Sequence, residues 1–377
     1  MEKAVGILCE YNPLHRGHAA QIAAVRRRFP EKPVVLLLSG TYVQRGEAAV
    51  CDPYARAAAA LACGADLVLM LPFPYSAFGA RGYAESAIRV FARLGAVDTV
   101  AFGACTQDEA LLAACADALE SPAFEARLSA ALAEDARASF AHLRAEVLEE
   151  FCPGGRDVLR EPNDILALEY LAAIRRGGYD LTPAVFPREG AYSAARVRET
   201  LEKGSDLWEG DVPEAAREIL KSAIPSVLPQ KKLGEALLCA LRAGMKCPEL
   251  SELGARIGDA ARGAENFEDF LDRAKTRKIT RARIRRGVLH AFFGVTEAGY
   301  PPVSYTVLLA ANDLGRRVLS FIYNIGDLPV YTKPSAPQKE GAPGAEVSAR
   351  AASVYAGLIG GAGDLLLKKN PIIVNKL

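Results

Sequence analysis

Strand-sized apolar runs alternate with helix-like segments through the first 105 residues, and this order constrains the fold most strongly. The apolar runs are Ala4–Leu8, Val34–Leu38, Leu67–Leu71 and Thr99–Phe102, and the helical patterns are His18–Arg28, Pro53–Cys63 and Ser86–Leu94. The run Val34–Leu38 is continuous rather than alternating, which is typical of a strand buried on both faces. Strands and helices that alternate over short connections predict a parallel α/β sheet.

The pattern of expected strands, helices and loops divides the whole chain into three parts. Residues 1–204 are expected to form an α/β, Rossmann-like domain, residues 205–229 a linker, and residues 230–377 a mostly helical, basic domain. Within the first part we expect an insertion of two Ala-rich helices over 108–150, broken near Ser121-Pro122, and a helix over Asn163–Arg176 capped by Asn163. Leu181–Phe186 and Ala194–Lys203 are expected to be one more strand and helix. A small hairpin is predicted from Val303–Ala311 and Arg317–Tyr323.

Composition excludes several classes of protein. With 50% hydrophobic and 24% charged residues, the chain has ordinary globular usage. No apolar run approaches the roughly 20 residues that span a bilayer, so no membrane segment is expected. The N-terminus is typical of a buried strand rather than of a signal peptide. The eight cysteines include no Cys-x-x-Cys pair, so no metal site is predicted, and a reducing cytoplasm is the expected location.

Two of the four histidines, His15 and His18, fall just after the first strand, at the start of the first helix. A helix N-terminus carries free N–H groups and a partial positive charge, and Gly17 allows a ligand to approach the backbone. Two imidazoles there can donate hydrogen bonds to a triphosphate and stabilise charge as pyrophosphate leaves. The other phosphate-binding signatures, G-x-x-x-x-G-K-[ST] and G-x-G-x-x-G after a strand, are missing from the sequence.

Two other interpretations of this pair stay open. His15 and His18 could be packing or surface histidines, or they could bind a metal. Metal binding is the weaker alternative, because no cysteine or carboxylate cluster lies nearby in the sequence to complete a coordination shell.

Six segments resemble, in the same order, the motifs of the tRNA(Met) cytidine acetate ligase family. They are Gly6–His18, Ser39–Ala49, Gly64–Pro72, Phe102-Gly103, Pro162–Ala167 and Tyr192–Arg198. The first segment holds the His-x-Gly-His arrangement of nucleotidyltransferases of the His-Ile-Gly-His class, and the first two are long enough to be specific. The likeness extends over essentially the whole chain.

The resemblance implies a Rossmann-like catalytic domain and a C-terminal region that holds tRNA. It implies ATP-dependent activation of acetate to acetyl-adenylate, with Mg²⁺ accompanying ATP, and transfer of the acetyl group to N4 of the wobble cytidine of elongator tRNA(Met). A cytoplasmic monomer or homodimer is expected. Two alternatives stay open: an adenylyltransferase that acts on another small carboxylate or phosphate ester, and a catalytically weakened tRNA-binding homologue.

The resemblance also assigns residues to roles. His15 and His18 are implied to be catalytic, and the residues implied to bind ATP are Gly6, Ile7, Glu10, Tyr11, Asn12, Pro13, Gly17, Gly103, Asn163, Arg188, Ser193 and Arg198. A hydroxyl and a guanidinium at a helix start suit the β and γ phosphates. Gln44 and Arg45 belong to a polar loop after a buried strand, and we assign them to tRNA, with phosphate or acetate as alternatives.

The sequence departs from the family pattern at several positions. Pro53 stands where the family has a lysine, and Met70 where it has a glutamate. Ala104 and Cys105 replace a serine and a glutamate, and Ala195 replaces a threonine. Loss of charged partners near an active site is one reason to expect a weakened or redirected activity.

A basic segment concentrates charge in the second half of the chain. Between Arg273 and Arg286, eight of fourteen residues are basic and none is acidic; the seven of them that we assign to tRNA are Lys275, Arg277, Lys278, Arg281, Arg283, Arg285 and Arg286. A solvated helix face normally mixes signs, so one sign predicts phosphate contacts. The overall charge of +1 conceals an uneven distribution. Residues 1–200 have 21 basic and 25 acidic residues, whereas residues 201–377 have 25 basic and 20 acidic residues.

Overall fold

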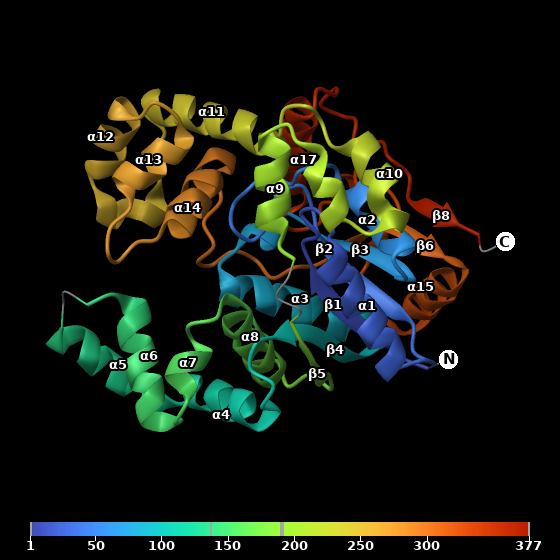
Figure 1. Cartoon of the computed structure of the whole chain (residues 1–377), viewed down its shortest axis with the longest axis horizontal. Coiled ribbons are helices and arrows are strands. Elements are labelled where there is room, and N and C mark those ends of the chain that lie inside the picture. Colours follow the sequence, from blue (N-terminus) through green and yellow to red (C-terminus); the bar gives the residue numbers. More distant parts are fainter. Residues whose placement is uncertain (1, 136–137, 189–191, 376–377) are drawn as a thin grey trace.

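The computed structural model describes residues 2–135, 138–188 and 192–375 and is built around one eight-stranded sheet (Figure 1). The strands are β1 Ala4–Cys9, β2 Val34–Ser39, β3 Leu67–Leu71, β4 Val97–Ala104, β5 Thr182–Pro187, β6 Thr306–Asn312, β7 Val330–Tyr331 and β8 Ile372–Val374. Their order is β5-β4-β1-β2-β3-β6-β7, and β8 also pairs with β6. Strands β1 to β5 are parallel, which confirms the predicted α/β class, and β6 runs antiparallel to β3.

The helices cover both faces of the sheet. They are α1 Arg16–Arg28, α2 Pro53–Ala62, α3 Ala80–Leu94, α8 Pro162–Arg176 and α9 Ala194–Glu202, with a short 3-10 turn, η1, at Tyr75–Ala77. Along β2, Val34 and Leu36 pack in the cluster with α1 and α2, whereas Val35 and Leu37 pack in the cluster with α3 and α8. The continuous apolar run of β2 is therefore buried on both faces, as predicted.

Local signals set the bounds of α2. The Asp52 side chain accepts hydrogen bonds from the N–H groups of Tyr54 at 2.9 Å and Ala55 at 3.2 Å, and Pro53 takes the first helical position. The chain turns at Gly64, whose φ of 106° suits glycine. Both ends were predicted from these residues.

The helical insertion between β4 and α8 has more helices than expected. It contains α4 Glu109–Leu119, α5 Pro122–Glu134, α6 Phe140–Phe151 and the short α7 Gly155–Val158. The predicted break at Ser121-Pro122 is confirmed, because the Ser121 hydroxyl accepts a hydrogen bond from the Phe124 N–H at 3.2 Å and caps α5. Ser139 caps α6 by accepting a hydrogen bond from the His142 N–H at 3.2 Å, so the chain has a further break between α5 and α6 that the Ala-rich composition did not reveal.

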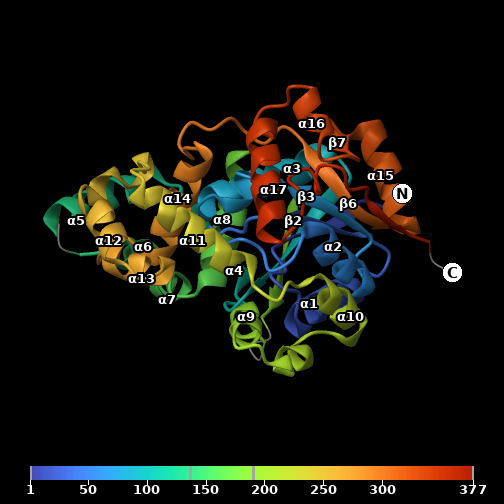
Figure 2. The same ribbon diagram turned by 90° about the horizontal axis from the view of Figure 1, so that it is seen from above.

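After α9 the chain stays on the face of the sheet that holds α2 and then forms a second group of helices. These elements are η2 Asp206–Asp211, α10 Glu214–Ala223, α11 Pro229–Arg242, η3 Pro248–Leu253, α12 Arg256–Gly263, α13 Phe267–Ala274 and α14 Arg281–Phe293. Helix α10 packs Ala216 and Leu220 into the cluster that holds α2. Figures 1 and 2 show α4–α7 and α11–α14 extending from the same end of the sheet. Within the described ranges, no helix is long and apolar enough to cross a membrane.

The predicted hairpin after Val303 is wrong. Only β6 is a strand there, and it is followed by α15 Asp313–Ile325, α16 Ala336–Lys339 and α17 Ala345–Leu358. The Asn312 side chain accepts a hydrogen bond from the Gly315 N–H at 2.9 Å and starts α15, which buries Val318 and Ile322 one turn apart. Strands β6–β8 extend the sheet formed by β1–β5, and the division at 204 and 229 stays a prediction.

Candidate active site

A cavity of about 340 Å³ opens where β1, β4 and β5 end. The strand order reverses between β1 and β4, and ligands of open parallel sheets bind at such a switch point, beyond the carboxyl ends of the strands. The predicted residues that line the cavity are Glu10, Tyr11, Asn12, His15, Gly17, His18, Gly103, Asn163 and Arg188. Residues at the ends of β1, β4 and β5 thus meet at one place because the sheet order puts these strands side by side, and Asn163 joins them from α8.

His15 and His18 fix each other at the start of α1. His15 is the N-cap residue, and its Nδ1 accepts a hydrogen bond from the Gly17 N–H at 3.1 Å. The Nδ1 of His18 accepts from the His15 N–H at 3.3 Å, and the two rings stack with centroids 3.6 Å apart. The Tyr11 ring lies 4.7 Å from the His18 ring. The free N–H groups of a helix start therefore hold both imidazoles.

Burial keeps both imidazoles neutral. Desolvation, with the charge of Arg188 nearby, lowers the pKa of His15 to about 4. Desolvation, followed by the charges of His15 and Arg188, lowers the pKa of His18 well below its ordinary value. A neutral imidazole whose Nδ1 accepts a hydrogen bond has its proton on Nε2, so we assign each ring an Nε2–H donor. With the positive end of α1, these donors can stabilise charge on a phosphate oxygen.

Acid is expected to destabilise the fold through these imidazoles. An unfolded histidine titrates near 6.5, so between pH 6.5 and 4 the unfolded chain binds more protons than the folded chain does at His15. The free energy of unfolding should fall by about 2 kcal/mol between pH 7 and pH 5 through His15 alone, measured by urea denaturation. His15→Asn, which keeps a capping oxygen, should reduce this loss.

The matched control is the exposed His142, which lies in α6 and does not line the cavity. His142→Asn should retain the wild-type dependence on pH. If His15→Asn lost as much stability as the wild type between pH 7 and pH 5, the buried neutral imidazole would not be the cause.

Asn163, at the start of α8, and Arg188, which follows β5, form a polar pair at the cavity. With its amide oxygen toward the guanidinium, Asn163 accepts hydrogen bonds from Arg188 Nε at 2.9 Å and Nη1 at 3.0 Å. The prediction that Asn163 caps its helix is wrong, because Glu161 is the N-cap residue and Pro162 takes the first helical position. The Asn163 side chain is therefore available to the cavity instead of to its own backbone.

Asp164, the next residue, was not singled out by the sequence reading. It is fully buried, and its carboxylate accepts hydrogen bonds from the N–H groups of Cys105 at 2.6 Å and Thr106 at 3.0 Å. These bonds fix the chain just beyond Gly103, where β4 ends. An acidic residue in the first turn of a helix is usually explained by its favourable interaction with the helix dipole. The sequence position of Asp164 therefore did not indicate that it holds the chain after β4.

Some residues that line the cavity were also not predicted from the sequence. Gln21 lies three residues after His18 on the same face of α1, so the helical spacing could have found it. Ala24 and Arg27 also line the cavity, but the helical repeat of 3.6 residues rotates them away from the His18 face, so this spacing does not predict them. Tyr83 and Tyr170 come from α3 and α8, and no local pattern marks them.

Five residues that the resemblance assigns to ATP do not line the cavity: Gly6, Ile7, Pro13, Ser193 and Arg198. A Cβ on Gly6 would lie 2.8 Å from the Phe91 ring, so glycine allows β1 to pack on α3. The Ser193 hydroxyl caps α9. Arg198 donates from Nη1 to the Asn12 carbonyl at 2.8 Å and so supports a lining residue from behind.

The departures from the family pattern also lie outside the cavity lining. Pro53 begins α2, Met70 is in β3, and Ala195 is in α9. Ala104 and Cys105 follow Gly103, but neither borders the cavity. None of these five residues is therefore part of the described lining of the cavity.

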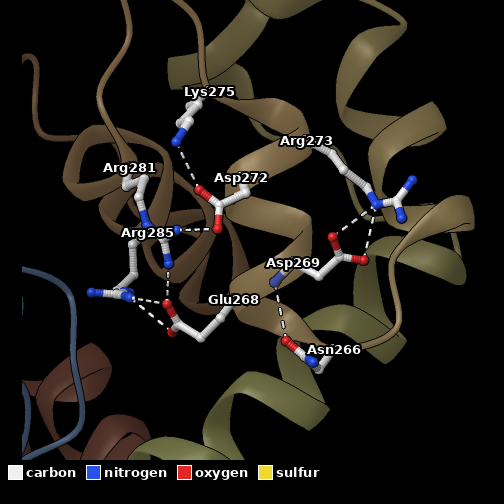
Figure 3. Close-up of polar contacts among 8 residues, drawn as sticks. All are labelled: Asn266, Glu268, Asp269, Asp272, Arg273, Lys275, Arg281 and Arg285. Carbon is white, nitrogen blue, oxygen red and sulfur yellow. Dashed lines mark hydrogen bonds and ion pairs between the residues drawn. The ribbon is translucent and has the colours of Figure 1, made fainter.

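Most of the basic side chains between Arg273 and Arg286 form ion pairs with carboxylates. Figure 3 shows Arg273, Lys275, Arg281 and Arg285 paired with acidic residues of α13. Arg283 pairs with Glu252 at 2.6 Å. The partners precede the segment in sequence, which is why the run itself contains no acid. Arg277 and Lys278 are exposed and have no carboxylate partner in the described part of the chain.

The loop that follows β2 touches the cavity wall. The Gln44 N–H donates to Glu10 Oε1 at 2.8 Å, while Arg45 is exposed. Burial raises the pKa of the Glu10 carboxyl, although the bond from Gln44 opposes this shift. Contact of Gln44 and Arg45 with tRNA stays a prediction.

Known proteins resemble this chain over most of its length. Residues 2–362 match the model of a family described as HIGH Nucleotidyl Transferase. A protein of Syntrophotalea carbinolica named tRNA(Met) cytidine acetate ligase is 32% identical over 309 residues, which cover 76% of this chain and 73% of that protein. A protein of the same name from Syntrophomonas wolfei is 32% identical over 78% of this chain and 76% of its own length.

Solved structures extend the likeness to the whole fold. Thermotoga maritima TmcAL bound with alpha-thio ATP superposes with a TM-score of 0.90 at 26% identity, covering 99% of this chain and 100% of that one. The apo form of the same protein gives a TM-score of 0.91 at 25% identity, with the same coverage.

Proposed function

Because this chain belongs to the HIGH nucleotidyl transferase family and, within it, to the tRNA(Met) cytidine acetate ligases, we propose that it joins acetate to a cytidine of tRNA(Met) in an ATP-dependent reaction. An acetate oxygen attacks the α-phosphorus of ATP, and pyrophosphate leaves as acetyl-adenylate forms. The N4 amino group of the wobble cytidine of elongator tRNA(Met) then attacks the acetyl carbonyl. AMP leaves, and the amino group loses a proton.

One observation carries this proposal: a pair of neutral imidazoles at the start of α1 faces the cavity at the switch point of the sheet. In the first step negative charge builds up on pyrophosphate as it leaves. The Nε2–H groups of His15 and His18, together with the N-terminus of α1, are placed to bind that charge. The donors are fixed before the reaction, so little reorganisation is needed when charge develops.

The remainder of the cavity suits a nucleotide. We assign Gly103, Asn163 and Arg188 to the adenylate part of ATP, and the unpartnered buried Nδ2 of Asn12 is a further donor to the phosphates. Among the described residues, no three His, Cys, Asp or Glu side chains form a metal cluster. Mg²⁺ would neutralise phosphate charge, and Glu10 is the one carboxylate of the described lining that could hold it or its water ligands.

For tRNA we propose the basic helices of the C-terminal part, with residues 1–204 acting on ATP. Arg277 and Lys278, which are exposed and lack a carboxylate partner among the described residues, are the most available cations for phosphate. The paired arginines of α14 can exchange a carboxylate for a phosphate. A tRNA substrate places this activity in the cytoplasm.

The test is nucleoside mass spectrometry of elongator tRNA(Met) after incubation with the protein, ATP and acetate. N4-acetylcytidine should appear at the wobble position and should be missing when either ATP or acetate is omitted. A transcript with uridine at that position is the matched control and should gain no acetyl group.

Acetylation of the control transcript, or of wild-type tRNA without ATP, would contradict the proposal. Pyrophosphate release that requires a different carboxylic acid would keep the adenylate step but change the acyl group.

A further inference from the structure

The loop Gln44–Glu47 is wedged between the cavity wall and α14. It closes on itself through hydrogen bonds from the Gly46 N–H to the Val43 carbonyl at 2.8 Å and from the Val43 N–H to the Glu47 carbonyl at 3.0 Å. Gly46 has a φ of 74°, and a Cβ there would lie 3.0 Å from Cα of Arg286. Glycine therefore permits direct contact between this loop and the backbone of α14.

Glu47, at the end of this loop, pairs with two arginines from different helices, Arg198 of α9 and Arg285 of α14. Its Oε1 lies 2.6 Å from Arg285 Nη1, and its Oε2 lies 3.4 Å from Arg198 Nη2. The side chain of Glu47 is 13% exposed and that of Arg285 is 11% exposed, so solvent screens the pair weakly. Arg198 in turn donates to the carbonyl of Asn12, which lines the cavity.

On its other side, Arg285 joins a chain of ion pairs in the basic segment (Figure 3). Its Nη2 lies 2.8 Å from Glu268 Oε1, and Glu268 also pairs with Arg281. Arg281 pairs with Asp272, which accepts a hydrogen bond from Lys275 at 2.9 Å. Ion pairs thus continue without a break from Lys275, beside the exposed cations of the basic segment, to Arg198, which bonds to the carbonyl of the lining residue Asn12.

We infer that Glu47 is a positioning residue that couples the basic segment to the nucleotide site, an inference that rests on the proposed function. It holds Arg198 against the Asn12 carbonyl and Arg285 against the loop. A phosphate of tRNA that draws Arg281 or Arg285 away from Glu268 changes how tightly Arg285 holds Glu47. Coupling between binding sites is reciprocal, so ATP and tRNA should alter each other's affinity through this residue.

The test measures ATP affinity by calorimetry on the whole chain without tRNA. Glu47→Gln, which keeps the shape and removes the charge, should weaken ATP binding about tenfold. Arg285→Gln, a residue that does not line the cavity, should weaken it by a comparable factor. The double variant should be no weaker than Glu47→Gln alone, because both changes break the same pair. Glu47→Asp, which restores the charge, should recover part of the affinity.

Glu252→Gln is the matched control. Glu252, in η3, pairs with Arg283, which lies on α14 as Arg285 does, and it forms no ion pair with the Glu47 loop. It should leave ATP affinity unchanged. In the wild type, saturating tRNA should shift ATP affinity severalfold, and this shift should be lost in Glu47→Gln.

Unchanged ATP affinity in Glu47→Gln, or additive effects with Arg285→Gln, would overturn the inference. If Glu47→Gln fails to fold by circular dichroism, Arg285→Gln decides the question alone. Affinity is read without turnover, so failure to acetylate tRNA would overturn the proposed function only. Normal acetylation together with additive effects would overturn the coupling only.

Discussion

Replacing His18 by alanine is expected to slow pyrophosphate release from ATP and acetate by about 10²–10⁴-fold. The variant loses the Nε2–H donor and the ring that stacks on His15. It also removes the acceptor of the His15 N–H, so the first turn of α1 is held less firmly. Release should be measured by coupled spectrophotometry at saturating ATP and acetate.

The Michaelis constant for ATP should rise less than the rate falls, because the donor acts mainly on charge that develops in the transition state. His142→Ala, an exposed change in α6, is the control and should keep the wild-type rate. A His18→Ala enzyme within a factor of three of wild type would show that this imidazole does not assist the chemistry.

Replacing Arg56 by methionine is expected to lower the free energy of unfolding by about 3–5 kcal/mol. Arg56 is fully buried in α2 and bonds to main-chain carbonyls rather than to a carboxylate. It donates to Glu10 O at 2.6 Å, to Cys51 O at 3.1 Å and to Gly40 O. Methionine fills much of the space but leaves these buried carbonyls without a donor, and urea denaturation should measure the loss.

Arg28→Met is the comparison, because Arg28 is exposed and donates one hydrogen bond, to the Val185 carbonyl. It should cost less than about 1 kcal/mol. Arg56 joins the ends of β1 and β2 beside the cavity, so its variant should also weaken ATP binding at a temperature where it is still folded. Equal losses in the two variants would rule out the buried guanidinium as a special contributor.

Much of the fold could be predicted because short-range signals were strong. The bounds of α2 follow from Asp52, Pro53 and Gly64, and the continuous run of β2 gave its burial on both faces. The prediction of secondary structure failed where the same residues can either form a turn between strands or start a helix. Asn312-Asp313 was interpreted as a turn between strands, yet the same side chains start a helix well, and burial of Val318 and Ile322 decided for α15.

The candidate site was found only in part for a related reason. The His-x-Gly-His pattern marks a helix start after a strand, so His15 and His18 could be located from the sequence. Arg188 and Asn163 join them because β5 pairs with β4 and α8 precedes β5. The tyrosines of α3 and α8 that line the cavity have no neighbours in sequence that would reveal this.

By itself the sequence determined the parallel α/β class, the main helices and strands of residues 1–105 and the family. Only the tertiary structure decided which charges meet: the one-signed segment Arg273–Arg286 is largely neutralised by acids of α13 and η3, and Arg285 reaches Glu47, which is 238 residues away. Caps and periodicity act over a few residues, so they can be read from sequence. Ion pairs depend on which surfaces pack together, and that is settled only when the whole core forms.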